Sequence, residues 1–337
     1  MAQRIATTRL DGGTEVAYAV TGTGPFVVYV PGWLSHLELS WAWPAERGFY
    51  ETLAQGRTLL RYDKPGCGLS GAADRPYSMD LELETLAAVV RAAGADRFDL
   101  LGVSLGAPVA AAWAAARPDT VDRLVLYGGW VRGAEIASPG VREHVLALVA
   151  AHWGLGSDVL ADIFMPGADA AGRAAFTRYQ RESADAQTAH DMLALCYRVD
   201  VADALAGIRA RTLVVHRDHD RAAPVEQGRQ LAAGILGARF ELVPGQAHVP
   251  YVGDVDAIAR PVRRFLGLPA LRRSATPSLT ARQREVAALV SDGLTNREIA
   301  GRLHITERSA ESHVERICDR MGFRSRSQIA AWYASGG

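Results

Sequence analysis

A serine stands between two glycines where an apolar run ends. The run is FDLLGV at 98–103, and it leads into the pattern Gly102-Val-Ser104-Leu-Gly106. Because glycine has no Cβ, the chain can turn there sharply enough to leave a strand, enter a helix and expose the serine hydroxyl. Such a hydroxyl can attack an acyl group once a base takes its proton. Short Gly/Ser patterns also occur by chance in ordinary strand-to-helix loops, so this one needs support from elsewhere in the chain.

An acid and a base follow at two other points where apolar runs end. Asp220 comes just past the run RTLVVH, and His248 comes just past the run RFELVPG. The carboxyl ends of parallel strands meet at one edge of a sheet, so we expect both side chains to meet Ser104 there. The histidine can take the serine proton, and the aspartate can orient the histidine and stabilise its charged form. The three residues predict acyl transfer through a serine nucleophile.

Other titratable residues near Asp220 compete for its role. Asp218 remains an alternative acid, because it lies in the same segment, HRDHDRAAP. His216 and His219 lie beside the two aspartates, and each is more simply interpreted as a loop residue. The sequence favours Asp220 and leaves Asp218 as a candidate.

Acyl hydrolysis also requires backbone N–H groups that face the oxygen on which negative charge develops. Leu105 directly follows the candidate nucleophile and is expected to supply one of them. Trp33, in the loop PGWLSH after the run FVVYV, is expected to supply the other. The two amides complete the predicted oxyanion hole.

Strand-like and helix-like segments alternate around these residues. Apolar, β-branched runs that alternate with helices predict a mainly parallel sheet covered by helices on both faces, an α/β fold. Strands are expected at 14–20, 26–30, 58–63, 98–103, 123–129, 211–216 and 239–245, and helices at 79–94 and 104–116.

Residues from about 131 to 203 interrupt this alternation. They contain no strand-like run, and the pieces VREHVLALVAAHWG and HDMLALCYRVD are typical of amphipathic helices. A helical insertion between two strands predicts a lid above the sheet edge. Its aromatic residues could line an apolar pocket, although for each of them packing in the lid's own core is the simpler interpretation. These residues are Trp153, Phe164, Phe176, Tyr179 and Tyr197.

The chain changes character near its end. Residues 1–268 are expected to form one domain, 269–277 a linker with proline, serine and arginine, and 278–337 a small helical domain. Patterns of Ser or Thr followed three residues later by Glu or Gln mark helix starts, and Thr306 is a further candidate cap for a helix that runs to Met321. The capping pairs are Thr280 with Gln283, Thr295 with Glu298, and Ser325 with Gln328.

Composition excludes some classes of function. Lys plus Arg number 37 and Asp plus Glu number 37, so the overall charge gives no reason to expect nucleic acid or a membrane, although a local basic patch could hide within it. Cys67, Cys196 and Cys318 lie far apart, without the spacing of metal ligands or of a disulfide framework. We therefore expect no metal, no cofactor and a reducing compartment. The absence of a long apolar segment predicts a cytoplasmic protein with no membrane partner.

Residues 1–268 resemble the α/β-hydrolase family through the motifs VPGW, RYDKPGCGLS, GVSLG, DRAAP and QAHVPY. The resemblance implies an α/β-hydrolase fold with Ser104, Asp220 and His248 as a catalytic triad. Many members carry His-Gly at the oxyanion loop, whereas this chain has Pro31-Gly32. The change removes a side chain but leaves the Trp33 amide in place.

The segment LTARQREVAALVSDGLTNREIAGRLHITERSAESHVERICDRMGF is similar to the LuxR-type helix-turn-helix domain. The resemblance implies binding to double-stranded DNA, with the later helix of the motif in the major groove. Many members have lysine where this chain has Glu311, which implies a different sequence preference. Position by position, the amides of Thr295 and Asn296 would hold phosphate, and the groove would be faced by Arg308, Ser309, Glu311, Ser312 and Arg316.

Together these patterns predict a one-component transcription regulator. The hydrolase domain would sense a small apolar ester, lactone or amide, and an active triad would also hydrolyse it. The mixed charge of the recognition helix implies weak binding by one copy and therefore a homodimer on two half-sites. Two alternatives stay open: a catalytically silent ligand receptor, and a metabolic serine hydrolase whose tail serves only for assembly.

Overall fold

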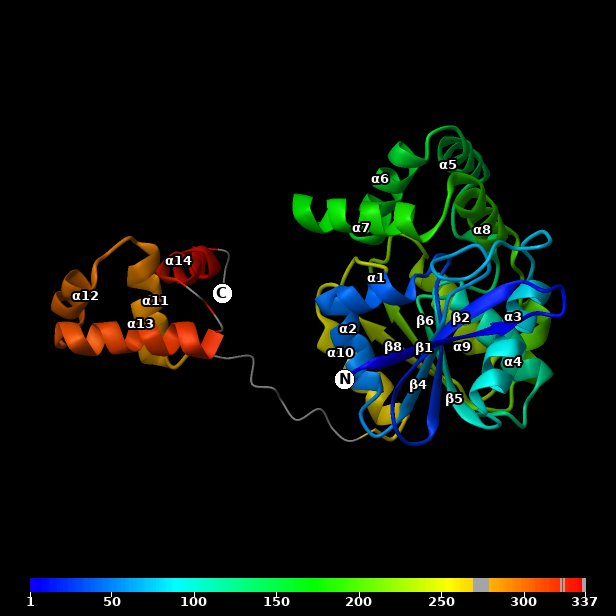
Figure 1. Cartoon of the computed structure of the whole chain (residues 1–337), viewed down its shortest axis with the longest axis horizontal. Coiled ribbons are helices and arrows are strands. Elements are labelled where there is room, and N and C mark those ends of the chain that lie inside the picture. The colour runs from blue at the N-terminus through cyan, green and yellow to red at the C-terminus, as the bar shows by residue number, and fades with distance from the viewer. Residues whose placement is uncertain (269–278, 322, 324, 335–337) are drawn as a thin grey trace. The chain divides into compact units, whose positions relative to one another are not determined.

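The computed structural model describes residues 1–268, 279–321, 323 and 325–334 (Figure 1). The chain divides into two compact units, Met1–Ala270 and Leu271–Gly337. The predicted linker, 269–277, lies outside the described residues, so the domain limits at 268 and 278 remain predictions. Among the described residues, no helix is long and apolar enough to cross a membrane.

The first unit is built on an eight-stranded sheet with the order β1-β2-β4-β3-β5-β6-β7-β8. β2 pairs antiparallel with β1 and β4, and all other neighbours are parallel. The strands are β1 (Gln3–Arg9), β2 (Glu15–Gly22), β3 (Phe26–Val30), β4 (Thr58–Tyr62), β5 (Phe98–Val103), β6 (Val121–Tyr127), β7 (Arg211–Arg217) and β8 (Arg239–Val243). The central strand β5 is buried over its whole length, as its continuous apolar run predicts.

Helices cover both faces of this sheet. α2 and α10 lie together on one face, and α3, α4 and α9 cover the other (Figure 1). α3 begins at the cap Ser78 and ends at Gly94, which adopts the left-handed conformation that stops a helix. The helices are α1 (Leu37–Ala42), α2 (Pro44–Leu53), α3 (Met79–Ala93), α4 (Gly106–Ala116), α9 (Val225–Gly234) and α10 (Val255–Phe265).

Between β6 and β7 the chain forms a group of helices at the carboxyl edge of the sheet (Figure 1). We call the segment 131–203 the lid. Two of its four α-helices, α6 and α7, were not among the pieces expected from the sequence. The lid contains η1 (Gly133–Glu135), α5 (Pro139–Ala151), α6 (Trp153–Phe164), α7 (Ala170–Ser183), α8 (Ala186–Arg198) and η2 (Ala202–Gly207).

The second unit consists of helices around a small apolar core. The capping boxes expected at Thr280 and Thr295 are both formed, and the Thr306 hydroxyl accepts a hydrogen bond from the Ser309 amide at 3.1 Å. The helices are α11 (Ala281–Ser291), α12 (Asn296–Leu303), α13 (Glu307–Met321) and α14 (Arg326–Ala334). The fully buried residues of this core are Val286, Ala287, Ile299, Ala310, Ile317 and Ile329.

Candidate active site

The turn after β5 places Ser104 in a strained backbone conformation. Its φ is +56°, in the left-handed region that residues with a side chain rarely occupy. The flanking glycines make the turn possible, because there is no room for a Cβ at either position. A Cβ on Gly102 would lie 2.2 Å from the Gly106 carbonyl oxygen, and one on Gly106 would lie 2.2 Å from the Val30 carbonyl oxygen. The turn therefore holds the Ser104 hydroxyl at the carboxyl edge of the sheet.

Ser104, His248 and Asp220 lie in one chain of hydrogen bonds. The distance from His248 Nε2 to Ser104 Oγ is 2.8 Å, and the distance from His248 Nδ1 to Asp220 Oδ2 is also 2.8 Å. The other carboxylate oxygen of Asp220 accepts hydrogen bonds from the amides of Ala222 and Ala223. All three side chains are buried, each at most 8% exposed. This geometry can pass a proton from the serine to the histidine.

The surroundings of Asp220 favour its ionised form. Burial alone would raise the pKa of the carboxyl, but the charge and hydrogen bond of His248, the charge of His216 and the Ala223 amide together lower it. His216 lies behind the carboxylate, with Nε2 at 2.9 Å from the Ala223 carbonyl oxygen. Burial lowers the pKa of His216, against the raising effects of the Asp220 charge and the Ala223 carbonyl.

Asp218 and His219 do not take part in this chain. Asp218 Oδ1 instead accepts a hydrogen bond from the Gly245 amide at 2.9 Å, which joins the loops after β7 and β8. The side chain of His219 is exposed to solvent. The geometry therefore favours Asp220 over Asp218 as the partner of His248.

The loop after β3 lies against the serine. A Cβ on Gly32 would be 3.4 Å from Ser104 Cβ, so the backbone approaches the hydroxyl closely. Within the described residues, the amides of Trp33 and Leu105 donate to no backbone or side-chain acceptor. Their role as donors to an oxyanion beside Ser104 stays a prediction.

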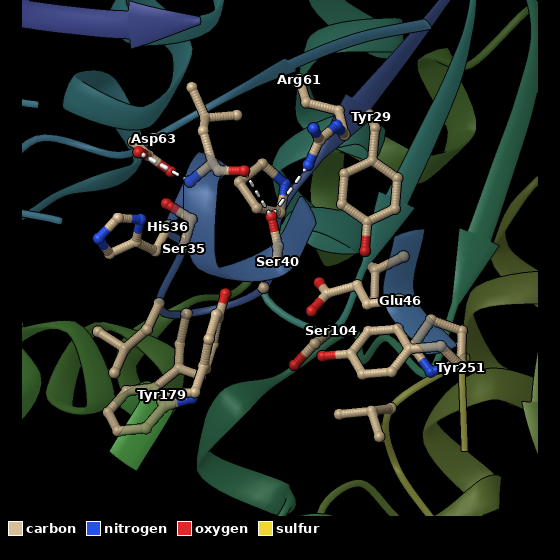
Figure 2. Close-up of a pocket in the computed structure, with 18 of the residues that line it drawn as sticks. Tyr29, Ser35, His36, Ser40, Glu46, Arg61, Asp63, Ser104, Tyr179 and Tyr251 are labelled. Carbon is tan, nitrogen blue, oxygen red and sulfur yellow. Dashed lines mark hydrogen bonds between the residues drawn. The ribbon is translucent and has the colours of Figure 1, made fainter. Parts of the chain in front are cut away.

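Two pockets open on either side of Ser104. The first has an empty volume of about 700 Å³, its mouth included, and reaches from Ser104 toward β3, β4 and α2 (Figure 2). Its exposed lining is mainly apolar, and polar side chains gather at its far end. The polar residues at its far end are Tyr29, Glu46, Tyr50, Arg61, Tyr179 and Tyr251.

The second pocket, of about 620 Å³, lies under the lid and is mainly apolar. Trp33, Phe164 and His248 border both pockets. The remaining apolar lining residues include Trp130, Ile136, Val141, Val145, Leu160 and Leu193.

Of the five lid aromatic residues named from the sequence, four line a pocket and one packs inside the lid. Phe164, Phe176 and Tyr179 line the first pocket, and Tyr197 lines the second. For these four residues the interpretation as lid core alone is wrong. Trp153 lines neither pocket, because its indole N–H donates to the Ala184 carbonyl oxygen at 3.0 Å inside the lid.

The lid also touches the histidine directly. The Phe164 carbonyl oxygen accepts a hydrogen bond from the His248 amide at 2.8 Å. The Phe164 ring stacks on the imidazole, with the ring centroids 5.5 Å apart. A shift of α6 would therefore move His248, a link that no sequence pattern indicated.

In the second unit, α13 presents its polar face to solvent. Its apolar positions pack inward as expected, with Ala310 and Ile317 fully buried. The residues predicted to face DNA lie on the other side of this helix. Arg308, Glu311 and Arg316 are exposed, and Ser309 and Ser312 are partly exposed.

The start of α12 differs from the expectation in one respect. The Thr295 amide already donates to the Glu298 carboxylate at 2.7 Å, so a phosphate would have to displace that carboxylate. The Asn296 side-chain oxygen accepts a hydrogen bond from Arg326 Nη1 at 2.7 Å. Arg326 therefore brings a positive charge to this helix start, which no sequence pattern predicted.

Comparison with known protein families supports both parts of the chain. Residues 25–254 match the model for the alpha/beta hydrolase fold, and residues 277–333 match the model for the bacterial regulatory proteins of the luxR family. Both matches confirm the predicted fold class. Among the described residues, no group of three or more His, Cys, Asp or Glu side chains could hold a metal ion.

Similar proteins are hydrolases by name. The chain is 27% identical to a pyrrolizixenacetamide deacetylase of Xenorhabdus hominickii, over 76% of this chain and 96% of the relative. It is 29% identical to a 2-hydroxy-6-oxo-2,4-heptadienoate hydrolase of Pseudomonas putida, over 76% of this chain and 94% of the relative. Among solved structures, the enol-lactonase of Burkholderia xenovorans aligns with a TM-score of 0.64 at 26% identity, covering 78% of this chain and 100% of that one.

Proposed function

Since the chain belongs to the α/β-hydrolase family and also carries a LuxR-type DNA-binding domain, we propose that it is a transcription regulator controlled by an acyl compound. The first unit binds and cleaves the compound, and the second binds double-stranded DNA. The observation that carries the proposal is the hydrogen-bonded chain of Ser104, His248 and Asp220 in a protein that also has a DNA-binding domain.

Ser104 Oγ attacks the acyl carbon while His248 Nε2 takes the serine proton, and Asp220 stabilises the imidazolium. The former carbonyl oxygen becomes an oxyanion facing the amides of Trp33 and Leu105. When this intermediate collapses, the alcohol or amine leaves with the proton from His248. Water then attacks the acyl-serine in the same way, which releases the acid and restores Ser104.

The names of the relatives narrow the class of compound. They refer to an acetamide, an oxo-dienoate and an enol lactone, each of which contains a carbonyl group. The lid pocket is mainly apolar, which favours a ligand with a hydrocarbon part. We therefore assign the substrate to the esters, lactones and amides of small, partly apolar acids.

On DNA, α13 enters the major groove and α12 lies across the backbone. Arg308, Ser309, Ser312 and Arg316 supply donors, whereas Glu311 accepts from cytosine. Asn296 and Thr295 approach a phosphate at the start of α12. The mixed charge of α13 favours a homodimer on two half-sites over a single copy.

A serine-reactive fluorophosphonate tests the chemistry. The probe should label Ser104 in the full chain, and Ser104→Ala should abolish both labelling and hydrolysis of short p-nitrophenyl esters. Ser138→Ala is the matched control, because Ser138 is an exposed lid serine that lines neither pocket. Ester hydrolysis that persists in Ser104→Ala would overturn the assignment. An unlabelled wild-type chain that still binds ligands would favour the silent receptor.

A further inference from the structure

The first pocket contains a buried carboxyl that the reaction at Ser104 does not use. Glu46, on α2, is 3% exposed. Its Oε1 atom accepts a hydrogen bond from the Tyr50 hydroxyl at 2.7 Å. Its Oε2 atom is fully buried and has no partner of ordinary hydrogen-bond geometry among the described residues, although the nearby Tyr251 hydroxyl interacts with this carboxyl and lowers its pKa. A buried carboxylate oxygen left in this state is costly unless a ligand satisfies it.

Tyrosine hydroxyls surround this carboxyl. Figure 2 shows the Tyr29 hydroxyl directed toward Glu46, and the Tyr251 hydroxyl lying between Glu46 and Ser104. Burial raises the pKa of Tyr29, Tyr50 and Tyr251, so all three remain neutral phenols. Each neutral phenol donates one hydrogen bond, as Tyr50 does to Glu46, and its oxygen keeps lone pairs that can accept another.

Arg61, a cation beside this cluster, is already engaged. Among the described residues no ion pair joins Arg61 to Glu46, because the Arg61 guanidinium lies over the Tyr50 ring, 4.1 Å from its centroid. It also donates to Ser40 Oγ at 3.0 Å and to the Gln3 side chain. Burial raises the pKa of Glu46 to about 7, against the lowering effects of the Tyr50 hydrogen bond and the Arg61 charge. Within the part of the chain that the structure describes, the Glu46 carboxyl thus feels the Arg61 charge but forms no ion pair.

We propose that Glu46 and the surrounding tyrosines form a subsite for a primary amine on the ligand, while the lid pocket holds the ligand's hydrocarbon part. An ammonium group has three donors and no acceptor, which matches an acceptor-rich site, and it supplies a direct counter-charge. A hydroxyl supplies one donor and no charge, and a carboxylate would be repelled by ionised Glu46. The proposal rests on the proposed function only in placing the reacting carbonyl at Ser104, between the two pockets.

Three amphiphiles of equal chain length test the subsite without any turnover. Octylamine, 1-octanol and octanoate are titrated into the full-length Ser104→Ala chain near pH 8, with intrinsic tryptophan fluorescence as the readout. Octylamine should bind at least about ten-fold more tightly than 1-octanol, as a charge-assisted hydrogen bond predicts. Octanoate should bind most weakly. Tighter binding of octanoate would instead identify Arg61 as the recognising group and overturn the proposal.

Glu46→Gln in the same background assigns the preference to this carboxyl. The affinity for octylamine should fall about ten-fold, and its advantage over 1-octanol should disappear. Glu38→Gln is the matched control. Glu38 is exposed on the neighbouring α1, so this substitution should leave the order of the three ligand affinities unchanged. An advantage that survives in Glu46→Gln contradicts the proposal, and thermal melting checks that the variant folds. If Glu46→Gln does not fold, the order of the three ligand affinities in the Ser104→Ala chain decides between the outcomes.

The two proposals can fail separately. If fluorophosphonate does not label wild-type Ser104 while the amine preference holds, the hydrolase assignment fails and the subsite stands. If labelling is stoichiometric but octylamine shows no advantage, the subsite fails and the hydrolase assignment stands.

Discussion

Two buried carboxyls of the first unit show how neighbouring groups decide the role of a residue. Burial favours the neutral form of both Asp220 and Glu46. Asp220 also receives two amide hydrogen bonds and the charge of His248, so its pKa falls. For Glu46 burial outweighs the Tyr50 hydroxyl, the Arg61 charge and the Tyr251 hydroxyl, so its pKa rises. One side chain is held as an anion that supports the histidine, and the other is left to titrate near neutrality.

This difference predicts a pH dependence of folding. The pKa of Glu46 rises from an ordinary value of 4.5 to about 7. Between these two pH values the folded chain therefore keeps a proton on Glu46 that the unfolded chain releases. The contribution of Glu46 to the free energy of unfolding therefore falls as pH rises through this window, by roughly 3 kcal/mol when the full shift is realised. Glu46→Gln cannot ionise, and should gain stability relative to the wild-type chain from about pH 5 to about pH 8.

Urea denaturation of both chains across this pH range measures the difference. The contributions of all other titrating groups cancel in the difference between the two free energies of unfolding, because both proteins contain them. Glu38→Gln provides the comparison for loss of an exposed carboxylate, and its difference from wild type should stay flat. A constant difference for Glu46→Gln would mean that the carboxyl titrates at its ordinary pKa.

At the scale of elements, sequence patterns predicted the strands and helices whose signal lies in neighbouring residues. They missed features that depend on how distant segments pack. The strand β5 and the helix α3 were predicted because continuous apolar runs and helical spacing are encoded in neighbouring residues. β1 was missed, since most of its residues are exposed and give no apolar run. The spacing of α13 predicted which face packs inward, and its buried residues confirm that prediction.

The predicted site shows the same limit. Ser104, Asp220 and His248 could be selected because each follows a strand at the same sheet edge. Glu46 could not, because a single glutamate on a short helix looks like an ordinary solvated residue until α2 is packed against β3 and β4. The contact between Phe164 and His248 likewise joins segments that are far apart in the chain.

The exposed face of α13 predicts an effect on DNA binding. Arg316→Ala should weaken binding to a duplex selected by the wild-type chain from a random pool, by about 1 to 3 kcal/mol if the guanidinium reaches a base edge. Arg284→Ala, on the exposed side of α11, removes the same charge outside the recognition helix and should have a smaller effect. Fluorescence anisotropy with labelled duplex measures both. Equal affinities for wild type and Arg316→Ala would remove this residue from the interface.

At the scale of the whole molecule, regulation requires that occupancy of the pocket change affinity for DNA. A ligand can shift an equilibrium only when it binds the two states of the protein with different affinity. The lid is the element best suited to report occupancy, because Phe164 borders both pockets and also contacts His248. We infer that acylation of Ser104 alters the packing of α6 and thereby the assembly of the DNA-competent dimer.

The most direct test titrates the full chain against its selected duplex before and after stoichiometric labelling of Ser104 with a fluorophosphonate. The Ser104→Ala chain, treated in the same way, controls for labelling elsewhere. We predict that labelling changes the affinity of the wild-type chain for DNA by at least about five-fold and leaves that of Ser104→Ala unchanged. Complete labelling of Ser104 with unchanged DNA affinity and unchanged oligomeric state would contradict the account, and would favour a metabolic hydrolase with an assembly tail.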